Sequence, residues 1–403
     1  MTLQTALSGL LGAQTGLNTV SNDLANASTT AFKSQTALFE DVYPANASNA
    51  PGIGTATEGI SSDLTQGALT STGNPLDAAI QGNGYFVVSQ NGTQHYTRDG
   101  AFQLSSSGQL ETLNGATVQG YASTNGGGIS GTLGPITINT GSVSANPTSA
   151  LGVTLNLNAG DAVPGTAPLN PNDPTSYNET TSVVSYDSLG NANRVQLYFV
   201  NQSAGQWNVY AQPETANGTA VSATPTLLTT LGFSSSGGLT SGNPATLSGV
   251  NWGNGAANSN INFNFSGTTL AAQNFSVAGI TNDGYAPGTY SGTTISSNGS
   301  ITSTYSNGQS VSAGKIAIAN FINAEGLTPV TGNLYTASST SGQPVVNTPG
   351  TGLAGTLSGG ELESSNASTS SLLVSLIQYQ QAYQANTSVI QTEQQDNQRL
   401  VQI

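Results

Sequence analysis

Histidine most often carries acid–base or metal chemistry near neutral pH, and this chain of 403 residues has a single one, His95. It stands between Gln94 and Tyr96 in a short hairpin-like segment, as an ordinary strand or surface residue does. Because the sequence has no second histidine and no cysteine, neither a His- or Cys-ligated metal site nor a catalytic triad can be assembled around it. The absence of cysteine also excludes disulfide bonds.

The other residues that could do chemistry form no reactive group. Acidic residues are scattered, without a pair suited to acid–base catalysis. Arg98 and Asp99 precede Gly100 at a turn tip, where Asp-Gly normally serves backbone geometry. Residues 350–355 fit the spacing G-x-G-x-x-G but join no strand to a helix and have no basic neighbour, so we interpret them as a glycine loop. We expect no catalytic residue, no cofactor, no metal and no enzymatic activity.

Charge is scarce throughout the chain. Charged residues make up 6% of it, against roughly a quarter in an average soluble protein. The net charge of -14 leaves no basic patch that could neutralise phosphates, so we expect neither nucleic acid nor anionic membrane surfaces as partners. No apolar run is long enough to span a membrane, and the first residues do not resemble a Sec signal, so we expect a cytosolic protein or one exported without cleavage.

The elements that would position any site begin with two helical ends. Leucines recur every seven residues from Leu3, followed three places later by alanine or valine, which predicts a helix over about 2–27 with a heptad seam. A second seam lies in a Gln-rich segment, predicted to be helical from about Ser364 to Val401. We predict that these residues form a coiled-coil or assembly interface: Leu3, Ala6, Leu10, Ala13, Leu17, Val20 and Leu24 with Leu372, Leu376, Tyr379, Tyr383, Asn386, Ile390 and Leu400.

Between the helical ends, turn signals separate short alternating segments. Asn91-Gly92 is the strongest hairpin signal. Further turn signals follow it as far as Asn114-Gly115, and residues 182–210 again alternate strand-like segments with a turn. We predict a mainly β protein with paired terminal helices and two antiparallel β-domains, the outer inserted in the inner. The expected divisions are a helical domain (1–33, 361–403), an extended connector (34–75), an inner β-domain (76–145, 284–360) and an inserted outer β-domain (146–283).

Motifs at both ends resemble those of bacterial flagellar rod and hook proteins. They are residues 18–26 (NTVSNDLAN), 30–34 (TAFKS) and 380–386 (QQAYQAN), with 82–87 (GNGYFV) and 96–102 (YTRDGAF) shared across the group. Residues 186–190, 207–210, 283–288 and 305–309 resemble the hook branch in particular. The chain departs from the family at Ala367-Ser368 and Gln381, which remove charges, so neutral hydrogen bonds are expected there.

The resemblance implies a structural subunit of the flagellar hook. Such a subunit polymerises into a curved tube, a universal joint that passes torque from rod to filament around a central channel. The implied partners are further copies of the chain, the distal rod protein, the hook cap scaffold, the hook–filament junction protein and the flagellar type III export apparatus. A distal rod subunit is the nearest alternative, disfavoured by the insertion at about 146–283. A secreted β-rich adhesin or surface-layer protein is a more distant one.

Overall fold

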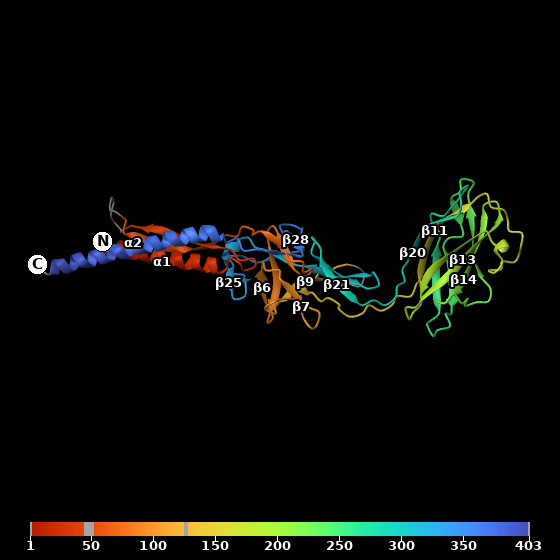
Figure 1. The fold of residues 1–403 in the computed structure, drawn as a ribbon, viewed down its shortest axis with the longest axis horizontal. Coiled ribbons are helices and arrows are strands. Elements are labelled where there is room, and N and C mark those ends of the chain that lie inside the picture. Colours follow the sequence, from red (N-terminus) through yellow and green to blue (C-terminus); the bar gives the residue numbers. More distant parts are fainter. Residues whose placement is uncertain (1, 44–51, 125–127, 402–403) are drawn as a thin grey trace. The chain divides into compact units, whose positions relative to one another are not determined.

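The chain forms two compact units, seen in a computed structural model that describes residues 2–43, 52–124 and 128–401 (Figure 1). Unit 2 comprises Thr140–Ser291 and Tyr305–Gln309. Unit 1 holds the rest of the chain, on both sides of unit 2 in sequence. Among the described residues, strands are the main regular element and the two long terminal helices pair, so the predicted mainly β class with paired helical ends is confirmed.

The two long helices belong to unit 1. Helix α1 covers Thr2–Ala25, and helix α2 covers Thr369–Val401. The predicted start of α2 near Ser364 is wrong by five residues, because this part of the chain is held in other pairings: the Ser364 amide donates to the Ala68 carbonyl (2.8 Å). In the part of the chain that the structure describes, no helix is both long and apolar enough to cross a membrane.

The segment expected as a connector is extended and paired. Strands β1 (Gln35–Val42) and β2 (Gly54–Ser62) form an antiparallel two-stranded sheet with a bulge after Leu38. This hairpin lies against α1, where the Ser8 hydroxyl accepts from the Thr55 amide (3.2 Å). The hairpin thus gives α1 a second neighbour besides α2.

The main sheet of unit 1 is antiparallel and contains 13 strands, two of which, β21 and β22, reach into unit 2. Tyr85, Tyr96 and Phe321 form its aromatic centre, with edge-on ring contacts at 4.8 and 6.0 Å. Its central path runs β21 (Tyr290–Ile295), β22 (Ser300–Tyr305), β23 (Ser310–Ile316), β9 (Thr117–Ala122), β5 (Tyr85–Gln90), β6 (Thr93–Thr97), β26 (Leu334–Thr336) and β25 (Thr328–Val330).

Shorter strands complete unit 1. The sheet also includes β7 (Phe102–Leu104), β8 (Leu110–Thr112), β10 (Gly134–Pro135), β24 (Ile318–Asn320) and β27 (Val345–Asn347), and a 3-10 turn covers Ala324–Gly326. Two further pairs tie the chain before α2 to the chain after the hairpin: β28 (Thr356–Gly359) with β4 (Ala78–Gln81), and β29 (Glu361–Glu363) with β3 (Leu69–Ser71).

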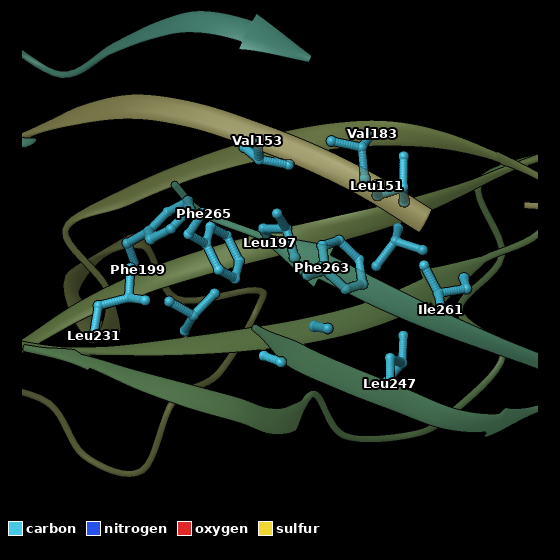
Figure 2. Close-up of a cluster of buried hydrophobic side chains, with 14 of the residues drawn as sticks. Leu151, Val153, Val183, Leu197, Phe199, Leu231, Leu247, Ile261, Phe263 and Phe265 are labelled. Carbon is cyan, nitrogen blue, oxygen red and sulfur yellow. The ribbon is translucent and has the colours of Figure 1, made fainter. Parts of the chain in front are cut away.

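Unit 2 is a sandwich of two five-stranded sheets around one apolar core (Figure 2). Alternating side chains such as Ile261 and Phe263 point inward, as expected for half-buried strands. One sheet is ordered β12 (Glu179–Tyr186), β13 (Ala192–Ser203), β14 (Gln206–Glu214), β15 (Thr226–Phe233), β16 (Leu239–Ser241). The other contains β17 (Ala245–Val250), β18 (Ser259–Asn264), β11 (Ala150–Asn158), β19 (Thr269–Ala271) and β20 (Ser276–Asn282), and a 3-10 turn covers Pro174–Ser176.

The expectation that both β-domains are wholly antiparallel is wrong for this second sheet. Strand β11 pairs with β18 and with β19 in parallel, and with β20 in antiparallel orientation. Parallel neighbours need a long crossover, and about a hundred residues separate β11 from β18 in sequence. Local turn signals cannot reveal pairings between strands so far apart.

Replacing Phe263 by alanine should lower the unfolding free energy of unit 2 by about 3–5 kcal/mol, because it leaves a cavity in a close-packed core. Trp207 and Trp252, the two tryptophans of the chain, are both buried in unit 2, so tryptophan fluorescence during urea titration follows this unit. The half-exposed Val184→Ala is the matched control and should barely move the midpoint. Equal midpoints for the two variants would contradict this account of the core.

Candidate assembly site at the terminal helices

Helices α1 and α2 pack antiparallel, and two glycines set their register (Figure 1). A Cβ atom at Gly9 would lie 2.9 Å from the Asn386 side-chain amide, and one at Gly16 would overlap the Tyr379 ring. From Gly9 to Gly16 the chain of α1 advances by seven residues, while the facing residue of α2 changes from Asn386 back to Tyr379, also seven residues. Side chains of α2 occupy the space that a larger residue at either glycine would fill.

Gly12 marks a different side of α1. A Cβ atom there would meet Thr55 and Phe39 of the hairpin at 3.4 and 3.5 Å, which is ordinary contact. Helix α1 thus has one side against α2 and another against the hairpin. Gly9 and Gly16 were not among the interface residues predicted from the sequence, although their seven-residue spacing matches that of the leucines and could have revealed them.

The seam residues predicted from the heptads differ in burial. On α1 the small residues are buried and most of the leucines are half-buried: Ala6, Ala13 and Val20 in the first group, Leu10, Leu17 and Leu24 in the second. On α2 the half-buried residues are Leu372, Leu376, Tyr379, Asn386 and Ile390. Leu3 and Tyr383 are exposed, and Leu400 lies in α2 with its side chain outside the described residues.

Pairing leaves an apolar face uncovered on each helix. Leu3, Leu7 and Leu11 of α1 are 43, 49 and 54% exposed, at the four-residue spacing that places them on one side of the helix. On α2, the exposed large apolar residues are Leu373, Val374, Ile377, Tyr383 and Val389, of which Leu373 and Ile377 share one side of the helix. Exposed apolar surface of this kind is typical of protein–protein contact sites.

Close in sequence to the end of α1 and the start of α2, one buried carboxylate forms ion pairs with two cations. Glu363 Oε1 lies 2.6 Å from Lys33 Nζ, and Oε2 lies 2.9 Å from Arg98 Nε. The Gly67 amide donates a further bond to Oε1 (2.9 Å). Arg98 also donates to the Gly84 carbonyl (2.8 Å). We call Lys33, Arg98 and Glu363 the Glu363 clamp; it joins the chain after α1, the end of β6 in the main sheet and the chain before α2.

Burial and charge act in opposite directions on the clamp. Burial alone would raise the pKa of Glu363, but Arg98 and Lys33 together hold it below its ordinary value. Burial lowers the pKa of Lys33, since Glu363, which Arg98 shares, offsets only part of the lost hydration. The carboxylate is therefore ionised near neutral pH.

The residues next to Lys33 are anchored one after another. The Ser34 amide donates to Asn366 Oδ1 (2.7 Å), and the Gln35 amide donates to Asp23 Oδ2 (2.8 Å). Asn366 Nδ2 also donates to the Asp63 carbonyl (2.8 Å). Side chains from both terminal segments thus fix the path from α1 into β1.

The residues first considered for chemistry have other surroundings. Arg98, interpreted from sequence as a turn-tip residue, is buried in the clamp, while Asp99 Oδ1 accepts from the Ala101 amide (3.0 Å) within the turn. His95 lies on β6. Residues 350–355 close on themselves through the Gly350 amide and the Gly355 carbonyl (2.9 Å). Among the described residues, no group of three or more His, Cys, Asp or Glu side chains could hold a metal ion.

Comparison with known proteins gives consistent relatives along the whole chain. A flagellar hook protein FlgE of Salmonella typhimurium is 36% identical over 404 residues, covering 98% of each chain. The FlgE protein of Escherichia coli is 35% identical over 410 residues, also covering 98% of each. The chain belongs to the flagellar hook protein family. This confirms the resemblance seen in its terminal motifs.

Family models and a solved structure agree with membership of the hook protein family. The models are the flagellar hook protein FlgE/F/G D1 domain (residues 79–154), the flagellar basal body protein FlaE D2 domain (154–285) and the flagellar basal body rod FlgEFG protein C-terminal (358–403). The crystal structure of the Helicobacter pylori hook protein FlgE2 matches with a TM-score of 0.56 at 17% identity, covering 72% of this chain and 98% of that one. That likeness concerns the fold.

Replacing Gly16 by alanine should weaken the helix pair, because the new methyl group overlaps the Tyr379 ring. Gly12→Ala is the matched control on the same helix: its methyl group fits, and alanine favours a helix over glycine by about 1 kcal/mol. Thermal melting followed by circular dichroism at 222 nm, which is dominated by the two helices, should show opposite shifts. Shifts in the same direction for both variants would contradict the proposed register.

Replacing Glu363 by glutamine should lower stability by about 3–5 kcal/mol at pH 7, because two buried cations lose their counter-charge. In the unsubstituted chain the stabilisation by Glu363 is present above its ordinary pKa of 4.5 and is lost as pH falls through the lowered folded value. Hydrogen exchange of the Gly67 amide, which bonds to Oε1, reports the clamp locally.

Glu361→Gln, on the same strand, is the control for this substitution. It should leave Gly67 protection and its acid dependence unchanged. The clamp would lose its assigned role if Glu363→Gln behaved like Glu361→Gln, or if Gly67 protection in the unsubstituted chain rose on acidification.

Proposed function

We propose that this chain is the structural subunit of the bacterial flagellar hook. Copies of it assemble into a flexible curved tube that transmits torque from rod to filament and encloses a central export channel. The observation that carries the proposal is the pair of terminal helices whose apolar faces remain uncovered after pairing, at Leu3, Leu7 and Leu11 and at Leu373 and Ile377. Relatives named as hook proteins, matched over 98% of the chain, support it.

The uncovered apolar faces account for cohesion between copies. Fully burying a leucine contributes about 1.5–3 kcal/mol, so several per helix hold neighbouring subunits without any charge pairing. The seam residues of both helices, from Leu3 to Leu24 and from Leu372 to Leu400, form the assembly interface within and between copies. In the tube, the helix pairs line the channel.

The β-structure divides into an inner and an outer domain. The inner domain comprises residues 76–145 and 284–360 and forms the middle of the wall. The outer domain comprises 146–283 and is inserted in it, while 34–75 connect it to the helical domain of 1–33 and 361–403. Neutral Asn, Ser, Thr and Gly surfaces let contacts exchange as a bent tube rotates, because each hydrogen bond contributes only about 0.5–1.5 kcal/mol.

The partners of this subunit follow from its place in the flagellum. They are further copies of itself, the distal rod protein below, the cap scaffold during growth, the junction protein at the filament and the export apparatus, which passes the chain without cleavage. The subunit catalyses no reaction and binds neither nucleic acid nor a membrane.

Deleting the gene should leave cells with flagellar rods but no hooks in electron micrographs. A plasmid carrying the unsubstituted chain should restore hooks, whereas one carrying Leu7→Ser and Leu11→Ser should yield folded subunits and few hooks, because the exposed face no longer favours association. The control Gln14→Ser, on an exposed α1 position, should restore hooks. Truncated rods would favour the distal rod alternative, and intact flagella would contradict both assignments.

A further inference from the structure

Asp23 is a buried carboxylate without a cation. It lies in the last turn of α1, is 0% exposed and makes one hydrogen bond, in which Oδ2 accepts from the Gln35 amide (2.8 Å). Its other oxygen, Oδ1, is buried and has no hydrogen-bond partner. A negative charge here also faces the carbonyl end of the helix, where the helix dipole disfavours anions. The ionised side chain is therefore poorly compensated.

The charged residues that flank the junction of α1 and β1 have hydrogen-bond or ion-pair partners of their own. On the chain leading into β1, Lys33 is paired with Glu363 of the C-terminal segment, and Glu363 is shared with Arg98 of the inner sheet. At the end of β2, Asp63 accepts from the Thr65 amide (2.9 Å). Burial raises the pKa of Asp23. The hydrogen bond from the Gln35 amide lowers that pKa, but by less, so the pKa lies above its ordinary value.

We propose that Asp23 is a proton-operated latch between α1 and β1. Uptake of one proton from solvent on Oδ1 removes the uncompensated charge, while Oδ2 continues to accept from the Gln35 amide. The hydrogen bond from Gln35 itself favours the ionised carboxylate, but the cost of burying the charge is larger, so the packed junction of α1 and β1 is more stable when Asp23 is protonated. Loss of the proton leaves a buried anion with one donor and destabilises the same junction. This inference concerns unit 1 alone and does not depend on the proposed function.

The latch and the clamp respond to pH in opposite directions. The stabilisation from protonating Asp23 is fully present below its ordinary pKa of 3.8 and is lost as pH rises through the raised folded value. The stabilisation from Glu363 is present at higher pH and is lost on acidification. The two anchors of residues 33–35 thus compensate for each other, so this junction loses only one of them at either extreme.

Hydrogen exchange of the full chain between pH 4 and pH 8 tests the latch at its own amide. After correction for the intrinsic exchange rate, protection of the Gln35 amide should fall as pH rises, by about tenfold for each unit by which the folded pKa of Asp23 is raised. Protection of the Gly67 amide, on the clamp, should not fall over the same range.

The Asp23→Asn variant distinguishes an effect of protonating Asp23 from a packing role of its side chain that does not depend on pH. Its amide oxygen can keep the bond from Gln35 without charge, so Gln35 protection should vary little between pH 4 and pH 8. Asp23→Ala, which loses the bond, should be less protected at every pH and shows that the contact itself is measured. An identical pH profile for Asp23→Asn and the unsubstituted chain would overturn the proposal.

Discussion

The carboxylate of Glu363, shared by Lys33 and Arg98, is the interaction on which the organisation of unit 1 depends. It uses two of the five basic residues of the chain and buries them almost completely. Removing ions from water costs several kcal/mol each, so such a cluster is stable only when every member is present. Since its members lie after α1, directly after β6 and before α2, the two ends of the chain must meet at the main sheet of unit 1.

The arrangement of the helices follows from this fixed base. Asn366 and Asp23 hold Ser34 and Gln35 beside the clamp, which sets where α1 ends and β1 begins. From there the helices run antiparallel, and Gly9 and Gly16 let them approach closely. Their outer faces stay apolar and uncovered. Rigid attachment at the base and exposed apolar surface along the helices suit a subunit that joins others through its ends.

Local signals predicted much of this structure, and long-range contacts were beyond them. The Asn91-Gly92 hairpin and the leucine heptads depend on neighbouring residues, so the strands and helices could be predicted from sequence. Lys33 and Glu363 are 330 residues apart, and although Lys33 lies in the TAFKS motif, nothing in the sequence indicates its pairing with Glu363. For the same reason, local signals could not predict that β11 pairs in parallel with β18 and β19. Nor could they predict that β29 pairs with β3, so that α2 begins later than expected.

A double-mutant cycle between Lys33→Met and Arg98→Met tests the shared carboxylate most directly. Both side chains bond to Glu363 through different oxygens, and the charge of Arg98 also acts directly on Lys33. Stabilities of the two single variants and the double variant, measured by hydrogen exchange at the Gly67 amide, should depart from additivity by at least about 1 kcal/mol. Additivity to within about 0.5 kcal/mol would show that the cations act independently and that Glu363 does not join the three segments.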